Sequence, residues 1–359
     1  MRLLIAGGGT GGHLYPGMAV AEEVVRRGGQ VLFVGTARGL EARAVPAAGY
    51  ALELLEVSGL KRVGLMAVLR GLLRLPNAFF RSLSILRRFR PDAVLGVGGY
   101  ASGPVVLAAA LWGYPTAIQE QNSVPGITNR ILSRLVRVVM VAFDEARRFF
   151  PARKTETIGN PVRGKLVTTL AAGSADPNVA PRILVVGGSQ GARAVNDLVL
   201  AAVEVLARSG SLPALVHQTG PSDGDRCNER YRAMGVAARI EVRPFIDDMA
   251  TAYHRASLVI ARAGALTLAE LAIAGRPAIL IPLPTATDDH QSKNAARFAA
   301  ANAAIVLNQR TATGAELAQL LSGLLADSGR RQAMAAAMRS LARPKAAADV
   351  VDRLEKLMS

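Results

Sequence analysis

The feature that most constrains the fold is a glycine-rich turn near the N-terminus, Gly7-Gly8-Gly9-Thr10-Gly11-Gly12-His13. It follows a short apolar run of strand type, Arg2 to Ala6, and precedes a helical pattern from His13 to Arg27. Five glycines in six positions let backbone N–H groups approach an anion, and the N-terminus of the following helix favours phosphate. We interpret the turn as a phosphate-facing or reaction-facing loop. A tight turn without a ligand is the alternative.

The same turn fits the dinucleotide fingerprint through Gly7, Gly9 and Gly12, which is a weak signal alone. The second predicted strand, Gln30 to Val34, ends in Gly35-Thr36, where a nicotinamide-binding fold would place an acidic residue for the ribose. His13 stands at the mouth of the loop, where an acid–base group is useful. The loop therefore favours phosphate or acid–base chemistry over hydride transfer.

A second unit of the same kind begins at Arg182, after a segment (171–181) rich in Ala, Gly, Ser, Asp and Pro that reads as a linker. The apolar run 183–186 is followed by Gly187-Gly188-Ser189-Gln190-Gly191-Ala192 and a helical pattern. Strand-like runs alternate with helical patterns throughout, which is typical of doubly wound parallel sheets. A length of 359 residues suits two domains. We expect an α/β fold in which the carboxyl ends of two parallel sheets face one ligand across a cleft.

The remaining predicted strands are short apolar runs between helical patterns. In the first unit they are 51–57, 93–97, 115–118 and 138–142, and in the second 214–217, 240–243, 258–261, 278–282 and 304–307.

The net charge of +16 calls for an anionic partner, which could be nucleic acid, an acidic membrane surface or a phosphorylated substrate. An aromatic content of 4% argues against base-stacking platforms for single-stranded nucleic acid. The single cysteine, Cys227, excludes an internal disulfide and suits a reducing compartment. The sequence enters a strand at once, without a signal-peptide pattern, so secretion is not expected.

Much of this charge lies in segment 61–90, where basic residues alternate with Leu and Phe. No acidic residue lies between Glu56 and Asp92. The pattern favours an interfacial membrane surface, with an ordinary core helix bearing a basic outer side as the alternative. The longest uncharged stretch, 93–119, is interrupted by glycines and prolines, so no membrane-spanning segment is predicted.

Two stretches of the second unit carry polar groups suited to a sugar nucleotide. The first runs from Ala261 through Gly264 into a helix that contains Glu270, whose carboxylate could accept from sugar hydroxyls. The second, 288–294, opens another helix, and an N-cap role for Asp288 is the alternative there. Asp223-Gly224-Asp225 matches the Asp-x-Asp of metal-dependent sugar transferases, but its context favours a surface turn.

Taken together, these stretches resemble the MurG family of peptidoglycan N-acetylglucosaminyltransferases, which make lipid II. The resemblance covers nearly the whole chain and depends on many motifs in order. They are Gly8-Gly9-Thr10-Gly11-Gly12-His13-Leu14-Tyr15-Pro16, Gly98-Gly99-Tyr100-Ala101-Ser102-Gly103-Pro104, Glu120-Gln121-Asn122, Gly159-Asn160-Pro161-Val162-Arg163, Gly187-Gly188-Ser189-Gln190-Gly191-Ala192, His217-Gln218-Thr219-Gly220, Phe245-Ile246-Asp247-Asp248-Met249, Arg262-Ala263-Gly264-Ala265-Leu266-Thr267, Glu270 and Asp289-His290-Gln291.

The resemblance implies a GT-B fold with two Rossmann-like domains, at 1–160 and 161–340, and a C-terminal helix (341–359) that packs back on the first domain. It implies an inverting transfer of GlcNAc from UDP-GlcNAc to the MurNAc C4 hydroxyl of lipid I, undecaprenyl-pyrophosphoryl-MurNAc-pentapeptide, without a cofactor or metal. Expected partners are an anionic membrane surface docked by segment 61–90 and other proteins of cell-wall synthesis, with no nucleic acid. The expected location is the cytoplasmic face of the inner membrane, as a peripheral protein in a pathway tied to cell shape and division.

The resemblance also assigns site residues. His13 is the candidate base, and Gly98, Gly99, Tyr100 and Ser102 belong to the acceptor-pyrophosphate loop. Contacts to UDP-GlcNAc are expected from Thr10, Gly11, Gly12, Asn122, Arg163, Ser189, Ile246, Ala265, Leu266, Thr267, Leu268, Ala269, Glu270 and Gln291, with Glu270 on the ribose and the helix at Ala265 facing the α-phosphate. The chain departs from the family at Gln119, where a histidine is usual. Because a neutral amide cannot take up a proton, Gln119 cannot be the base, and His13 is favoured for that role.

Three other functions remain open at this stage. A sugar-nucleotide epimerase shares the two-domain architecture but has no need of segment 61–90. A nicotinamide oxidoreductase fits the first loop but lacks the ribose acid. A non-catalytic nucleic-acid or membrane-binding module accounts for the charge, but leaves both glycine loops and Glu270 without a purpose.

Overall fold

The computed structural model describes residues 1–57, 65–171, 181–188 and 191–358. The chain divides into two compact units, the first formed by Met1–Gly164 with Arg343–Ser359 and the second by Lys165–Ala342. The sequence predicted domain boundaries after residues 160 and 340. Most of the expected linker, 172–180, lies outside the described residues.

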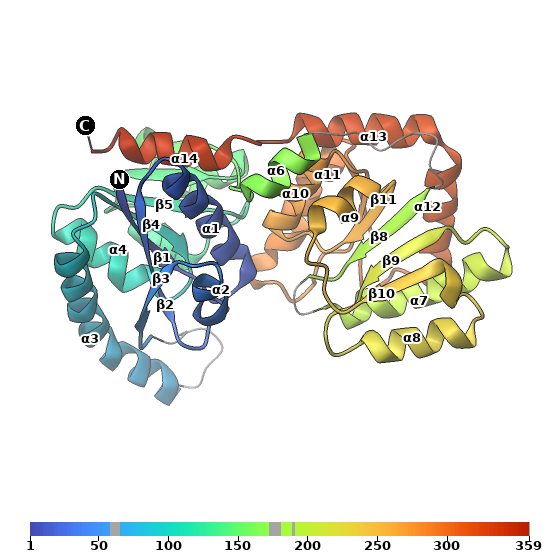
Figure 1. The fold of residues 1–359 in the computed structure, drawn as a ribbon, viewed down its shortest axis with the longest axis horizontal. Coiled ribbons are helices and arrows are strands. Elements are labelled where there is room, and N and C mark those ends of the chain that lie inside the picture. Colours follow the sequence, from blue (N-terminus) through green and yellow to red (C-terminus); the bar gives the residue numbers. More distant parts are fainter. Residues whose placement is uncertain (58–64, 172–180, 189–190, 359) are drawn as a thin grey trace. The chain divides into compact units, whose positions relative to one another are not determined.

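The first unit is built on a seven-stranded sheet in which every neighbouring pair is parallel (Figure 1). The strand order is β3-β2-β1-β4-β5-β6-β7. The strands are β1 (Arg2–Gly7), β2 (Gln30–Thr36), β3 (Ala51–Leu55), β4 (Ala93–Gly98), β5 (Thr116–Glu120), β6 (Val138–Val141) and β7 (Thr155–Thr157).

Helices cover both faces of this sheet. They are α1 (Gly11–Arg26), α2 (Glu41–Ala47), α3 (Leu65–Phe89), α4 (Ser102–Leu111), α5 (Ile127–Leu132) and α14 (Ala346–Glu355), with short 3-10 helices η1 (Asp144–Phe149) and η2 (Ala152–Lys154). Because side chains alternate along a strand, Leu3 and Ile5 of β1 pack with α1, α2 and α14, while Leu4 and Ala6 pack with α3, α4 and α5. Burial on both faces explains why β1 is a continuous apolar run.

The last helix belongs to the first unit although it ends the chain. Val350 and Leu354 of α14 are fully buried in the core shared with α1, and α14 lies alongside α1 (Figure 1). Arg27 forms an ion pair with Asp352 at 2.6 Å, and Arg353 pairs with Glu156 of β7 at 2.8 Å. Apolar burial supplies most of this attachment, because half-exposed ion pairs contribute little.

The second unit holds a six-stranded parallel sheet of order β10-β9-β8-β11-β12-β13. Its strands are β8 (Arg182–Val186), β9 (Ala214–Gln218), β10 (Ile240–Arg243), β11 (Leu258–Ala261), β12 (Ala278–Leu280) and β13 (Ala304–Val306). Its helices are α6 (Gly164–Ala171, beginning at the unit boundary), α7 (Arg193–Arg208), α8 (Gly224–Ala233), α9 (Met249–Arg255), α10 (Ala265–Ala274), α11 (His290–Ala300), α12 (Gly314–Ala326) and α13 (Ser328–Ser340), with η3 (Ala237–Arg239) and η4 (Thr287–Asp289).

The predicted alternation of strands and helices, and hence two doubly wound parallel sheets, is confirmed. Individual strand ends shift by one or two residues. The sequence missed β7, because the three residues Thr155–Thr157 at the sheet edge carry no apolar run. In each sheet the strand order reverses once, between β1 and β4 and between β8 and β11, and ligands bind at such points outside the carboxyl ends of the strands.

Segment 61–90 forms α3 from Leu65 onward, and residues 61–64 lie outside the described part of the chain. Leu83, Ile85 and Leu86 are buried in the core beneath the helix, whereas Phe80 is 66% exposed. Among the described side chains, the helix therefore packs on the core on one side and exposes both Phe80 and the basic residues Arg81, Arg87 and Arg88 on the other. Among the described residues, no helix combines the length and the apolar character needed to cross a bilayer.

Candidate active site

Two glycine loops meet at the point where the first sheet reverses its order. The N–H of Gly8, after β1, donates to the carbonyl of Gly98, after β4, over 3.2 Å. A Cβ on Gly7 would lie 2.3 Å from that same carbonyl oxygen, and Gly7 has a φ of +149°. Only glycine permits this approach, so the two loops touch backbone to backbone. The fold thus brings the turn before α1 and the turn before α4 into one site.

A buried acid that the sequence analysis missed fixes the first loop. Glu41, at the start of α2, is 1% exposed. Its Oε2 accepts from the N–H of Gly9 at 2.6 Å, and its Oε1 accepts from the N–H and hydroxyl of Thr36, both at 2.8 Å. A Cβ on Gly8 would lie 2.3 Å from the Glu41 carboxyl carbon. Glu41 therefore ties the loop after β1 to the end of β2, and its carboxylate is used by protein groups.

His13 is half-buried in the first turn of α1. Its Nδ1 lies 2.9 Å from Oε1 of Gln121, and Nε2 of Gln121 donates to the carbonyl of Val97 at 2.9 Å. Gln119 accepts from the same Nε2 through its Oε1 at 2.5 Å. The loops after β1, β4 and β5 therefore meet at the imidazole.

The turn after β5 is organised by Glu120, which is 1% exposed. Its carboxylate accepts from the N–H of Asn122 at 3.0 Å, the N–H of Gly126 at 3.2 Å and the side-chain amide of Asn129 at 2.9 Å. Asn122 is half-buried beside it. Glu120 thus holds the turn, and Asn122 stands in the loop next to the residues that contact His13.

Arg163 is exposed and lies beside α1. The carbon of its guanidinium is 5.6 Å from the ring centroid of Tyr15, which follows His13 by two residues. Stacking on an aromatic face leaves the edge of the guanidinium available for an anion. Thr10, Gly11 and Gly12 form the start of the same helix, with Thr10 as its N-cap residue. The first-unit residues expected to contact the donor, apart from Asn122, thus gather around the N-terminus of α1.

The expected acceptor loop continues from Gly98 into α4. Tyr100 is 52% exposed, whereas Ser102 is fully buried, so the hydroxyl of Ser102 faces the interior. Beyond Tyr100 lies an apolar cavity of about 410 Å³ between α3, α4 and α5. Its lining includes Phe79, Pro104 and Ile131, of which Ile131 is 61% exposed.

In the second unit, the turn after β11 leads into α10, with Gly264 as the N-cap residue. Ala265 and Leu268 are buried, so their side chains belong to the core, while Leu266, Thr267 and Ala269 are half-buried. Glu270 is 8% exposed, and its Oε2 accepts from the hydroxyl of the buried Tyr253 at 3.1 Å. Burial and the neighbouring carboxylate raise the pKa of Tyr253, which keeps this hydroxyl a donor.

The other expected donor contacts of this unit are spread over three loops. Ile246 lines a cavity of about 310 Å³ with Asp247 and Arg255. Gln291, at the start of α11, accepts from the N–H of Leu283 at 2.9 Å through its Oε1, which anchors the loop after β12. Ser189, which follows β8 in the sequence, lies outside the described residues.

The expected turn before a helix is present, since Asp223 directly precedes α8, but the Asp223 carboxylate is buried and not at the surface. Its exposed fraction is 6%, because Arg226 and Asn196 enclose it. Arg226 lowers the pKa of Asp223 to about 2, and the Asn196 amide that donates to it also bonds His217. Across the described ranges, no group of three or more His, Cys, Asp or Glu side chains could hold a metal. The bonds from Arg226 and Asn196 give Asp223 a structural role.

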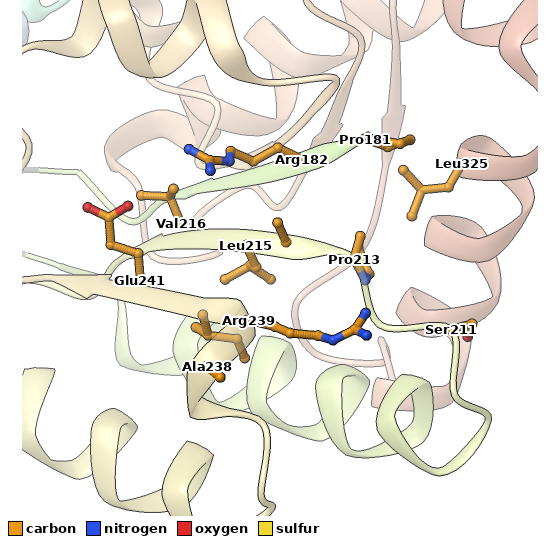
Figure 2. Close-up of a pocket in the computed structure, with 12 residues that line it drawn as sticks. Pro181, Arg182, Ser211, Pro213, Leu215, Val216, Ala238, Arg239, Glu241 and Leu325 are labelled. Atoms are coloured by element: carbon orange, nitrogen blue, oxygen red, sulfur yellow. The ribbon is translucent and has the colours of Figure 1, made fainter. Parts of the chain in front are cut away.

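A further cavity of about 650 Å³ lies at the amino ends of the strands of the second sheet. Figure 2 shows Arg182, Pro213 and Arg239 around it, at or next to the first residues of β8, β9 and β10. Arg239 donates to the carbonyl of Leu212 at 2.8 Å. Because ligands of such sheets bind outside the carboxyl ends of the strands, this cavity is separate from the candidate active site.

Comparison with known proteins agrees with this architecture. Residues 3–141 match the glycosyltransferase family 28 N-terminal domain, and residues 182–353 match the family 28 C-terminal domain. A relative from Anaeromyxobacter dehalogenans (strain 2CP-C) is 50% identical over 354 residues, covering 98% of this chain and 92% of the relative. One from Myxococcus xanthus (strain DK1622) is 50% identical over 361 residues, covering 100% of this chain and 93% of the relative.

Both relatives are named UDP-N-acetylglucosamine–N-acetylmuramyl-(pentapeptide) pyrophosphoryl-undecaprenol N-acetylglucosamine transferase. The crystal structure of Acinetobacter baumannii MurG superimposes with a TM-score of 0.80 at 35% identity, covering 99% of both chains. The expected GT-B fold is thereby confirmed. With half of its residues identical over its full length, the chain belongs to the MurG family of N-acetylglucosaminyltransferases.

Proposed function

We propose that this chain transfers N-acetylglucosamine from UDP-GlcNAc to undecaprenyl-pyrophosphoryl-MurNAc-pentapeptide, lipid I, and so makes lipid II for peptidoglycan. The observation that carries the assignment is the 50% identity to transferases of that name over 98% of the chain. The enzyme is a UDP-GlcNAc-dependent hexosyltransferase. The epimerase, oxidoreductase and binding-module alternatives have no comparable support.

The donor is assigned mainly to the second unit. The N-terminus of α10, with Gly264 as its N-cap residue, offers backbone N–H groups to the diphosphate. Glu270, already oriented by Tyr253, accepts from the ribose hydroxyls. Ser189, Ile246 and Gln291 complete the contacts, and Thr10, Gly11, Gly12, Asn122 and Arg163 add those of the first unit.

The reaction is a direct displacement at the anomeric carbon by the C4 hydroxyl of MurNAc, with inversion. His13 takes the proton from that hydroxyl as the new bond forms. Charge develops on the departing UDP, where Arg163 and the N-terminal amides of α10 stabilise it. Fixed dipoles and a guanidinium can neutralise a diphosphate, so the proposal requires no metal, and activity should persist in EDTA.

The test is a transfer assay with UDP-GlcNAc and lipid I, with product identified by mass. We expect UDP release only when both substrates are present. Conversion of UDP-GlcNAc without an acceptor would instead indicate an epimerase or a hydrolase. Absence of transfer to lipid I by folded enzyme would overturn the assignment.

Glu270→Ala tests the donor site. Loss of hydrogen bonds to a charged carboxylate should weaken UDP-GlcNAc binding by about 10- to 100-fold, measured by calorimetry. Glu229→Ala, which removes an exposed acid on α8, is the matched control and should bind normally. Equal donor affinity in both variants would show that Glu270 does not bind the ribose hydroxyls.

The first unit is assigned to the acceptor and to an anionic membrane surface, as a peripheral protein on the cytoplasmic face. Support comes from exposed apolar side chains on α3, at the end of α4 and on α5, including Phe80, Trp112 and Ile131, in a chain of net charge +16. Phe80→Glu should reduce sedimentation with vesicles containing anionic lipid, while Val25→Glu, on α1, should not. If the unaltered protein does not sediment with such vesicles, α3 is a core helix with a basic outer side.

A further inference from the structure

Two buried glutamine amides connect His13 to the backbone at the sheet edge. We propose that Gln119 and Gln121 are positioning residues that hold the His13 imidazole in the tautomer with its proton on Nδ1. The catalytic meaning of this tautomer rests on the proposed function, because only a transferase with His13 as its base needs it. The tautomer itself follows from the hydrogen bonds alone.

The orientation of the Gln121 amide is fixed by groups that can only accept. Its Nε2 lies 2.9 Å from the carbonyl oxygen of Val97 and 3.3 Å from that of Gln119. Reversing the amide would place its oxygen against both carbonyl oxygens, in a side chain that is 1% exposed. Oε1 of Gln121 must therefore be the atom that faces Nδ1 of His13, at 2.9 Å.

An amide oxygen carries no hydrogen, so the hydrogen in this contact belongs to Nδ1 of His13. A neutral imidazole has one N–H, which leaves the lone pair on Nε2. In the described part of the chain, Nε2 of His13 has no hydrogen-bond partner. The nitrogen able to accept a proton from a substrate is therefore the one not bonded to Gln121.

Gln119 adds one more hydrogen-bonded residue to this chain, because it bonds Gln121. Its Nε2 donates to the carbonyl of Gly159 over 3.4 Å, and its Oε1 accepts from Nε2 of Gln121 at 2.5 Å. Gln119 is 1% exposed, and no hydrogen bond joins it to His13 within the described residues. At the position where the family usually has a histidine, this chain thus has an amide that orients another amide. Its influence on His13 passes through Gln121.

The direct test is nitrogen-15 NMR of the unaltered protein with a neutral imidazole, with the His13 signals assigned from His13→Ala. We expect the signature of the Nδ1–H tautomer. His217 is an internal reference, because Asn196 fixes its proton on Nε2 by the same argument. A His13 spectrum of the Nε2–H tautomer would overturn the proposal whatever the activity. An Nδ1–H spectrum together with an active His13→Ala enzyme would instead overturn the catalytic role and leave the tautomer standing.

Variants of the two glutamines test whether their amides cause the Nδ1–H tautomer of His13. Gln121→Leu should yield a mixture of tautomers and lower kcat by up to about 100-fold with little change in donor KM. Gln119→Leu should act in the same direction but less, because it changes one bond further away. Thr155→Val is the matched control, since it also deletes one buried bond to a carbonyl, that of Pro151, in the same unit. A kcat loss in Thr155→Val equal to that in Gln121→Leu, or an unchanged His13 tautomer in Gln121→Leu, would contradict the proposal.

Discussion

Each unit has a histidine near the carboxyl end of a strand, and the two differ in how many of their ring nitrogens the protein binds. His13 is half-buried, with Nδ1 bonded to Gln121. His217 of β9 is fully buried, with Nδ1 2.8 Å from the Tyr231 hydroxyl and Nε2 3.0 Å from Oδ1 of Asn196. Both of its nitrogens are therefore used within the protein.

The comparison shows that an amide decides the tautomer in both units, while burial decides what the histidine can do. Asn196 donates to the carbonyl of Thr219 at 2.9 Å, so its oxygen faces His217 and the proton lies on Nε2. Burial lowers the pKa of His217 to about 4. His217 is thus a neutral structural group at physiological pH, and His13 is the histidine of this pair with a nitrogen available to a substrate.

The largest effect is expected for His13→Ala. Loss of the general base should lower kcat by at least about 100-fold, because acid–base catalysis contributes at least that much. The folded state should be little changed, since the imidazole is half-buried and makes one hydrogen bond. Turnover at saturating UDP-GlcNAc and lipid I is the measurement. A rate close to that of the unaltered enzyme would show that His13 is not the base, so that the two histidines would no longer differ in catalytic role.

His217→Leu should have the converse effect, on stability. It leaves the Tyr231 hydroxyl and the Asn196 oxygen buried without their partner, at a combined cost of about 3 kcal/mol in the free energy of unfolding. Urea denaturation measures it, and kcat per folded molecule should stay normal. His254→Leu, at a half-buried position on α9 of the same unit, should change stability by no more than about 0.5 kcal/mol. Equal losses in the two variants would show that the His217 bonds contribute nothing.

Much of this arrangement could be predicted from the sequence, because its signals are local. Glycine runs after apolar strands located both loops, and the turn at Gly264 located α10. The contacts that were missed join residues far apart in the sequence. Glu41 bonds Gly9 across 32 positions, and Gln121 bonds His13 across 108. The hydrophobic pattern of the sequence cannot predict such contacts, because the order of the strands in the sheet brings these residues together.

The unexpected burial of Asp223 has the same origin. Thr219-Gly220-Pro221-Ser222 is typical of an exposed turn, and nothing local indicates a partner. Asn196, which lies 27 positions earlier on α7, and Arg226 enclose the carboxylate after folding. Polar residues in turns can therefore be buried when a helix elsewhere in the chain supplies their hydrogen bonds.

Acid should distinguish the two histidines further. The pKa of His217 is about 4 in the folded protein, against 6.5 for an unperturbed histidine. The unfolded chain therefore binds the proton first, and stability falls as the pH drops from 6.5 toward 4, by about 2 kcal/mol at pH 5. The measurement is the difference in unfolding free energy between the unaltered protein and His217→Leu, which should shrink by that amount between pH 7 and pH 5. A constant difference would mean that His217 has an ordinary pKa in the folded state.

The smallest effect is expected for Tyr231→Phe. Burial raises the pKa of Tyr231, so its hydroxyl stays protonated and donates to Nδ1 of His217. Removing it leaves one acceptor without a partner and should cost about 1 kcal/mol in urea denaturation. The tautomer should stay Nε2–H, because Asn196 fixes it from the other side. If Tyr231→Phe moves the proton to Nδ1, the phenol and not the amide controls the tautomer, and the parallel with Gln121 and His13 fails.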